Sequence, residues 1–266
     1  MKTSRLWLIP YGLWVGLFVL VPTILMLFQS FVASNGQITL SHYHHFLRAD
    51  GAIYLRMTLN SFIYAALITL ITLFIAYPFA YILTKLTHKN LWLMLIILPT
   101  WINLLLKAYA FMGLLGAKGA INEALLFLGL GTHQLLFTKS AFVLVAVYIQ
   151  LPFMIIPIFQ SLEAIDDHLI AVSRDLGASQ RQTFWKVIFP LSLKGVRSGV
   201  QAVFIPSLSL FMLTRLIGGN RVITLGTAIE QQFLTTQNWG MGATIGVILM
   251  LVMVGMMWMT RERRSM

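Results

Sequence analysis

The sequence predicts an all-α membrane protein with about six transmembrane helices. Hydrophobic residues make up 58% of its 266 residues and charged residues only 10%, with a mean hydropathy of +0.83. Soluble domains usually carry about 25% charged residues, so a water-soluble core of this length could not bury so much apolar surface. The apolar residues also form runs of about 20, the length that crosses a bilayer as a helix.

Six stretches of the chain have this length and composition. They are spread evenly along the sequence, which predicts one transmembrane domain over residues 1–266. Because irregular backbone cannot face lipid, each stretch is expected to be one helix. The stretches are Leu6–Phe28, Thr58–Leu83, Leu91–Leu115, Phe137–Phe159, Val196–Ile217 and Gly242–Met259.

The basic residues predict that both termini lie in the cytoplasm. With the N-terminus inside, twelve Lys and Arg fall on inner segments and six on outer segments, in the direction of the positive-inside rule. The inner set is Lys2, Arg5, Lys85, Lys89, Arg174, Arg181, Lys186, Lys194, Arg197, Arg261, Arg263 and Arg264. The outer set is Arg48, Arg56, Lys118, Lys139, Arg215 and Arg221. The net charge of +11 therefore reflects helix orientation rather than nucleic-acid binding.

One inner connection is much longer than a connector needs to be. About 35 residues, 160–195, join the fourth and fifth stretches. Apolar residues recur every three or four positions over 162–176, which predicts a helix. Gly177 interrupts this pattern, where it would permit a tight turn or a close approach of another chain. A second helical segment follows, which we expect Pro190 to end, so the loop is a structured surface that indicates docking to a cytoplasmic partner.

This loop resembles the EAA loop of ABC importer permeases. The family pattern is Glu-Ala-Ala, three residues, Gly, nine residues and Ile-x-Leu-Pro. Gly177 and Pro190 match it at the required separation, but Ala171-Val172-Ser173 replaces Glu-Ala-Ala and Val187 and Phe189 replace Ile and Leu. The resemblance implies that the segment is a coupling helix that sits in a groove of an ATPase subunit. The implied coupling residues are Arg174, Asp175, Leu176, Gly177, Ala178, Ser179 and Pro190.

Nearly the whole chain is similar to the spermidine/putrescine permeases of that family. The matching residues are Trp101, Asn103, Lys107, Tyr109, Lys118-Gly119, Asn122-Glu123, Leu151-Pro152-Phe153-Met154 and Gly218-Gly219. The similarity implies a type I importer permease in the bacterial inner membrane. It also implies a heterodimer with a second permease, a pair of cytoplasmic ATPase subunits and an extracytoplasmic substrate-binding protein.

The chain has no Walker A motif, Gly-x-x-x-x-Gly-Lys-Ser/Thr, with which it could hydrolyse ATP. We therefore expect a transport subunit rather than an enzyme, with no cofactor and no metal of its own. ATP and magnesium would be bound by the partner ATPase.

Outer polar and aromatic residues are candidates for the translocation pathway. Carboxylates and aromatic faces attract a polyamine, although Trp and Tyr also anchor proteins at membrane surfaces and acids also occur as solvated loop charges. Lys107 lies about 24 Å into the third stretch, where a pathway role and snorkelling to the interface both stay open. The candidates are Trp101, Asn103, Lys107, Tyr109, Tyr148, Glu123, Glu230 and Asp50.

Two alternatives stay open at this point. One is an ABC permease for another solute, such as an opine, thiamine or ferric ion. The other is an integral membrane transferase, because acidic clusters can hold magnesium and pyrophosphate. Polytopic prenyltransferases use two Asp-rich loops, whereas this chain has one cluster, whose acids could equally complement a helix dipole. That cluster is Glu163, Asp166, Asp167 and His168.

Introduced cysteines test the predicted topology, because the natural chain has none. Asn35→Cys and Gln237→Cys should react with a membrane-impermeant maleimide in intact cells, since both positions are predicted to lie outside. Ser265→Cys should react only after permeabilisation. Labelling of Ser265→Cys in intact cells would place the C-terminus outside and reverse the orientation.

Overall fold

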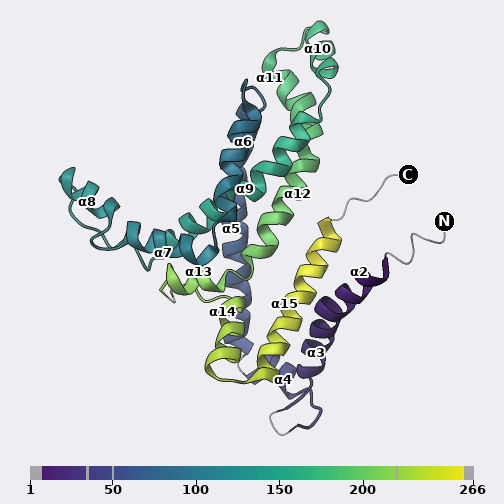
Figure 1. Cartoon of the computed structure of the whole chain (residues 1–266), viewed down its shortest axis with the longest axis vertical. Helices are drawn as coiled ribbons and strands as arrows, with labels where there is room; N and C mark the ends of the chain where they lie inside the picture. Colours follow the sequence, from purple (N-terminus) through teal and green to yellow (C-terminus); the bar gives the residue numbers. More distant parts are fainter. Residues whose placement is uncertain (1–7, 34–35, 50, 220, 261–266) are drawn as a thin grey trace. The chain divides into compact units, whose positions relative to one another are not determined.

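The computed structural model describes residues 8–33, 36–49, 51–219 and 221–260 (Figure 1). These residues form helices and irregular connections, with no strand among them beyond an isolated bridge between Val32 and Ile38. The predicted all-α class is confirmed. The described residues fall into two compact units, one within 1–58 and 225–259 and the other within 59–224. The single domain over 1–266 stays a prediction.

The first unit joins the beginning of the chain to its last helix. The Thr244 hydroxyl donates a hydrogen bond to the Ser30 carbonyl oxygen at 3.2 Å, and the Ser30 hydroxyl lies 2.8 Å from the Tyr43 hydroxyl. Gly246 packs against the sulfur of Met26. Its elements are α2 (Leu8–Val15), η1 (Gly16–Leu20), α3 (Val21–Gln29), α4 (Ser41–His44), η2 (His45–Ala49), α14 (Leu225–Glu230), η5 (Gln231–Thr235) and α15 (Trp239–Thr260).

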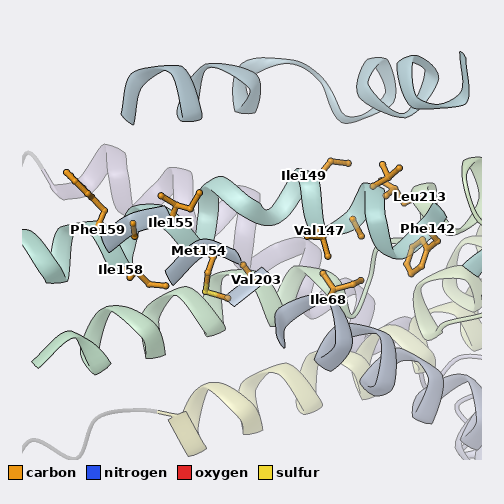
Figure 2. Close-up of a cluster of buried hydrophobic side chains, with 14 of the residues drawn as sticks. Ile68, Phe142, Val147, Ile149, Met154, Ile155, Ile158, Phe159, Val203 and Leu213 are labelled. Atoms are coloured by element: carbon orange, nitrogen blue, oxygen red, sulfur yellow. The ribbon is translucent and has the colours of Figure 1, made fainter. Parts of the chain in front are cut away.

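The second unit has its apolar core around one long central helix, α9. Phe142, Met154 and Ile158 of this helix are almost completely buried, and Figure 2 shows them with side chains from three neighbouring helices. The elements are α5 (Gly51–Leu83, from residue 59 on), α6 (Lys89–Ile97), η3 (Leu98–Trp101), α7 (Leu104–Leu115), α8 (Ala120–Phe127), α9 (Lys139–Glu163), α10 (Asp167–Asp175), α11 (Gln180–Thr183), η4 (Phe184–Ile188), α12 (Phe189–Ser207) and α13 (Phe211–Leu216).

Two glycines let α12 pack directly on the backbone of α9. A Cβ atom at Gly195 would collide with the Pro157 carbonyl oxygen and lie 2.5 Å from Cβ of Ser161. A Cβ atom at Gly199 would lie 2.7 Å from the sulfur of Met154. Helices in lipid associate through close van der Waals contact at small residues, because lipid tails are as apolar as the side chains. This Gly-x-x-x-Gly contact therefore holds the second unit together.

Five segments of the described chain are long and apolar enough to cross a membrane: Pro10–Gln29, Ala52–Leu83, Leu104–Phe127, Lys139–Glu163 and Trp239–Trp258. The expected stretch Val196–Ile217 is not among them. It is not one helix, because α12 ends at Ser207 and α13 begins at Phe211. Charged Lys194 and Arg197 lower the hydropathy of the first half of α12.

The third expected stretch, Leu91–Leu115, is also not one helix. α6 ends at Ile97, two residues before Pro99, and Ile102 is extended. The Asn103 side chain then caps α7 by accepting the Leu105 N–H at 2.8 Å. The break therefore falls at extended Ile102, where the Asn103 cap starts a new helix. The two pieces run in different directions (Figure 1).

Replacing Gly195 with leucine should weaken the contact between α9 and α12. The larger side chain must displace the backbone of α9, and overpacking costs about 1–3 kcal/mol. We expect a lower unfolding temperature of the detergent-purified protein. Gly113→Leu is the matched control, since a Cβ atom at Gly113 meets nothing within 4 Å. Equal unfolding temperatures for the two variants would contradict the importance of this contact.

Candidate functional site

The loop between α9 and α12 begins with a sharp turn. The helix predicted over residues 162–176 is broken there, because α9 ends at Glu163 and α10 begins at Asp167. The break has a local cause: the Asp166 carboxylate caps α10 by accepting the His168 N–H at 2.9 Å. The expectation that these acids complement a helix dipole is thus confirmed for Asp166 and Asp167.

Glu163 of the acidic cluster has a different partner. Its carboxylate accepts a hydrogen bond from the ammonium of Lys89 at 2.5 Å, which ties the start of α6 to the end of α9. Among the described residues, no group of three or more His, Cys, Asp or Glu side chains could hold a metal ion. The cluster therefore acts in this structure through capping and one ion pair.

Gly177 ends α10 in the left-handed conformation, with a φ of +81°. Its N–H donates to the Arg174 carbonyl oxygen at 2.8 Å, and the Ala178 N–H donates to the Ser173 carbonyl oxygen at 3.1 Å. This pair of bonds is a Schellman motif, which satisfies the last carbonyl groups of a helix. The predicted turn is confirmed. Nothing in the described part of this chain lies within 4 Å of a Cβ atom built at Gly177, so the close approach of another chain stays a prediction.

The next helix starts two residues later with a capping box. The Ser179 hydroxyl accepts the Gln182 N–H at 3.3 Å, and the Gln182 side chain accepts the Ser179 N–H at 2.9 Å. Ser173 and Thr183 bring their hydroxyl oxygens within 3.1 Å of each other, which joins α10 to α11. The segment from α10 through α11, which we name the α10 hairpin, is therefore held at its turn and across its two helices.

Pro190 does not end the second helical segment, so that expectation is wrong. α11, η4 and α12 run on without interruption from residue 180 to residue 207. η4 is a π-helical turn in which the Phe189 N–H bonds to the Phe184 carbonyl oxygen. Pro190 follows at the beginning of α12. The wider π turn directly before it accommodates a residue that lacks an N–H and carries a bulky ring.

The outer surface of the α10 hairpin carries unpaired apolar side chains. Leu169, Val172 and Leu176 are 49%, 54% and 82% exposed and lie three or four positions apart on α10. We name these three residues the α10 stripe. Exposed Arg174 lies beside them. A rigid helix with an apolar stripe next to a cation is suited to fill a groove on another protein.

The candidate pathway residues are dispersed. Lys107 is not 24 Å into a helix, because the third stretch breaks at Ile102 and Asn103; it lies one turn inside α7, where its N–H bonds to the Asn103 carbonyl oxygen at 3.2 Å. Trp101 and Tyr109 are largely exposed on η3 and α7. Glu123 lies in the first turn of α8, and Tyr148 packs on Phe111 at 5.0 Å. Glu230 ends α14 in the first unit, and Asp50 lies outside the described residues.

A groove of about 730 Å³ lies between α5 and α9, and no candidate pathway residue lines it. Its walls are mostly aliphatic, with Asn60, Lys139 and Ser140 as its polar members. The Asn60 amide also donates to the Ile223 carbonyl oxygen. No sequence pattern predicts this groove, because its two walls, residues 60–75 and 139–147, lie far apart in the chain.

Two of the residue pairs behind the family resemblance have structural roles. The Asn122 side chain is almost completely buried and bonds to the backbone of Gly116 and His133, which closes the loop between these two residues. Gly219 has a φ of +57° and packs against the ring of Phe137, leaving no room for a Cβ atom. These two positions therefore shape the loops in which they lie.

The helical fold and the apolar segments define a polytopic membrane protein with a structured loop between α9 and α12. The model of one family, described as "Binding-protein-dependent transport system inner membrane component", matches residues 12–261. The chain belongs to this family and is a multi-pass permease subunit. Family membership thus favours the permease over the transferase alternative.

Two relatives cover almost the whole chain, and a third covers more than half of it. It is 37% identical over 262 residues to the spermidine/putrescine transport system permease protein PotB of Escherichia coli K12, covering 95% of this chain and 94% of the relative. It is 34% identical over 250 residues to PotB of Haemophilus influenzae, covering 90% and 86%. The inner membrane ABC transporter permease protein YdcU of Escherichia coli is 32% identical over 170 residues, 58% and 54% of the two chains.

Solved structures agree on the fold. A chain of a bacterial ABC transporter that imports the acidic polysaccharide alginate superimposes with a TM-score of 0.78 at 15% identity, over 99% of this chain and 96% of that chain. A chain of the alginate transporter in complex with an alginate pentasaccharide-bound periplasmic protein gives 0.82 at 15% identity, over 97% and 92%. The type I permease fold predicted from the sequence is confirmed.

Proposed function

We propose that this chain is a permease subunit of an ATP-driven polyamine importer and forms half of its translocation pathway. The observation that carries the proposal is the 37% identity over 95% of the chain to a permease named for spermidine and putrescine. Family importers receive their solute largely from a separate binding protein. Another solute, such as an opine, thiamine or ferric ion, is therefore the competing outcome of any transport test.

The proposed assembly contains a second permease, a pair of cytoplasmic ATPase subunits and an extracytoplasmic binding protein. ATP and magnesium are bound by the ATPase, since this sequence has no Walker A motif. The exposed α10 stripe supports an ATPase partner, because its three aliphatic side chains are about half or more exposed in the part of the chain that the structure describes. A structural neighbour in complex with a periplasmic protein supports the binding-protein partner.

In this proposal, the α10 hairpin converts closure of the ATPase into movement of the transmembrane helices. Caps and hydrogen bonds at Asp166, Gly177 and Ser179 make the hairpin stiff. Its two ends continue into α9 and α12, which pack backbone to backbone. A force on the hairpin therefore reaches both helices together and alternates the pathway between inward-open and outward-open states.

The proposed orientation places both termini and the α10 hairpin in the cytoplasm, as the basic residues predict. The pathway is then expected to involve the outer residues named above. Aromatic Trp101 and Tyr109 are exposed and could attract a polycation through their faces. Lys107 would repel such a solute, so we assign it no ligand role by itself.

Uptake by the reconstituted complex tests the substrate. Proteoliposomes that contain both permeases and the ATPase, supplied with the binding protein, should accumulate radiolabelled spermidine or putrescine when ATP is inside. A non-hydrolysable ATP analogue is the control. Uptake of thiamine, an opine or ferric ion in place of polyamine would overturn the substrate and leave the permease class intact.

Gly177→Val should disable coupling while leaving insertion in the membrane normal. A β-branched residue at φ +81° costs about 1–3 kcal/mol of local strain. This strain should disrupt the turn at residue 177 that ends α10. We expect weaker co-elution with the ATPase or loss of binding-protein-stimulated ATP turnover.

Gly177→Asn is the matched control, because asparagine tolerates the left-handed region and the space around Gly177 is open. It should keep most of the turnover. Wild-type turnover from Gly177→Val would show that the loop is a passive connector.

A further inference from the structure

The π turn η4 places aromatic rings of the loop against α5. Phe184 and Phe189 lie at its two ends, five residues apart, and both contact Tyr77 of α5, with ring centroids 6.1 Å and 5.7 Å away. An α-helical turn repeats after 3.6 residues and would rotate these two positions away from each other. π turns occur frequently at functional sites.

Phe184 is the centre of a cluster of five rings. Its ring meets Tyr81 edge-on at 5.3 Å, Tyr77 at 6.1 Å and Trp185 at 5.3 Å. Phe189 completes the cluster at 6.4 Å. Phe184 is thus the loop residue whose ring contacts both Tyr77 and Tyr81 of α5, which lie one helical turn apart.

Hydroxyl contacts join this ring cluster to α10 and to α12. Thr183, the neighbour of Phe184, is buried and contacts the Ser173 hydroxyl of α10. On the α5 side, the Tyr77 hydroxyl lies 2.8 Å from the Ser192 hydroxyl of α12. The Lys85 ammonium also lies over the Tyr81 ring, 5.5 Å from its centroid, in a cation–π contact. A chain of contacts therefore leads from α10 through residues 183 and 184 to α5.

α5 needs such a connection because it is not covalently joined to the loop. α9 and α12 follow the α10 hairpin through the chain itself, whereas α5 can follow only through side chains. Interlocked edge-to-face rings resist relative displacement, since packed clusters have discrete arrangements and do not deform continuously.

We propose that Phe184 is a positioning residue that couples the ATPase-facing loop to α5, so that α5 moves together with the hairpin. The inference rests on the proposed function of the loop. It adds a specific claim: among the contacts of α5, those of the Phe184 ring carry the coupling, and loss of that ring separates ATP hydrolysis from transport without weakening the docking surface.

Phe184→Leu tests this claim in the reconstituted complex. The variant keeps an apolar side chain but removes the ring contacts with Tyr77 and Tyr81. We expect normal co-elution with the ATPase and continued hydrolysis, while the amount of polyamine taken up per ATP falls about threefold or more. Phe184→Tyr keeps the ring and should restore the ratio to near the wild-type value.

Phe233→Leu is the matched control, because it removes a comparable edge-to-face contact, with Trp239 at 5.5 Å, outside the loop. It should leave the ratio of uptake to hydrolysis unchanged. If Phe184→Leu fails to accumulate in the membrane, Tyr81→Leu takes its place, because it removes the Tyr81–Phe184 contact by changing α5 instead of the loop. The same fall in uptake per ATP is then expected.

Three results would overturn the inference. A wild-type ratio from Phe184→Leu or its Tyr81→Leu substitute would show that α5 does not depend on this ring. Loss of co-elution would make Phe184 a docking residue instead. An equal fall in the Phe233→Leu ratio would show a general packing effect. Failure of the proposed function is distinguishable, because the wild-type complex itself would then transport no polyamine.

Discussion

The contact on which the rest of this structure depends is the one between α9 and α12. Gly195 lies so close to the backbone of α9 that a methyl group would not fit, and a methyl group at Gly199 would press on the Met154 side chain. The loop leaves from the end of α9 and returns into α12, so this contact fixes the separation of its two ends. Lipid tails are as apolar as the helix surfaces, so the hydrophobic effect does not drive these helices together. Close van der Waals packing stabilises their association instead.

Because the contact between α9 and α12 holds the two ends of the loop, movement of the loop can be transmitted to both helices. Between the two helices, every turn of the backbone has a local side-chain or backbone explanation: the Asp166 cap, the left-handed Gly177 and the Ser179 capping box. The apolar α10 stripe is consequently presented on a stiff support. Stiffness matters because a flexible loop would absorb the movement of a partner instead of transmitting it.

Part of the fold could be predicted from the sequence, because the apolar composition indicates a lipid environment and Gly177 indicates a turn. The helical class, the first and last spans and the turn at Gly177 follow from such local rules. The break at Asn103, the turn at Asp166 and the continuity through Pro190 could not be foreseen. Asn and Asp are polar residues that cap helices only where the chain already turns, and a proline is tolerated when a π turn precedes it. The outer candidate residues stay a prediction.

Cross-linking from the tip of the α10 hairpin tests the central claim most directly. Leu176 is 82% exposed, and Leu176→Cys would be the only thiol of this chain. A short bifunctional reagent added to membranes that contain the assembled transporter should join this subunit to the ATPase, with an adduct of their summed mass. Phe127→Cys, 91% exposed at the end of α8, should give no such adduct. An ATPase adduct from Phe127→Cys and none from Leu176→Cys would contradict the account.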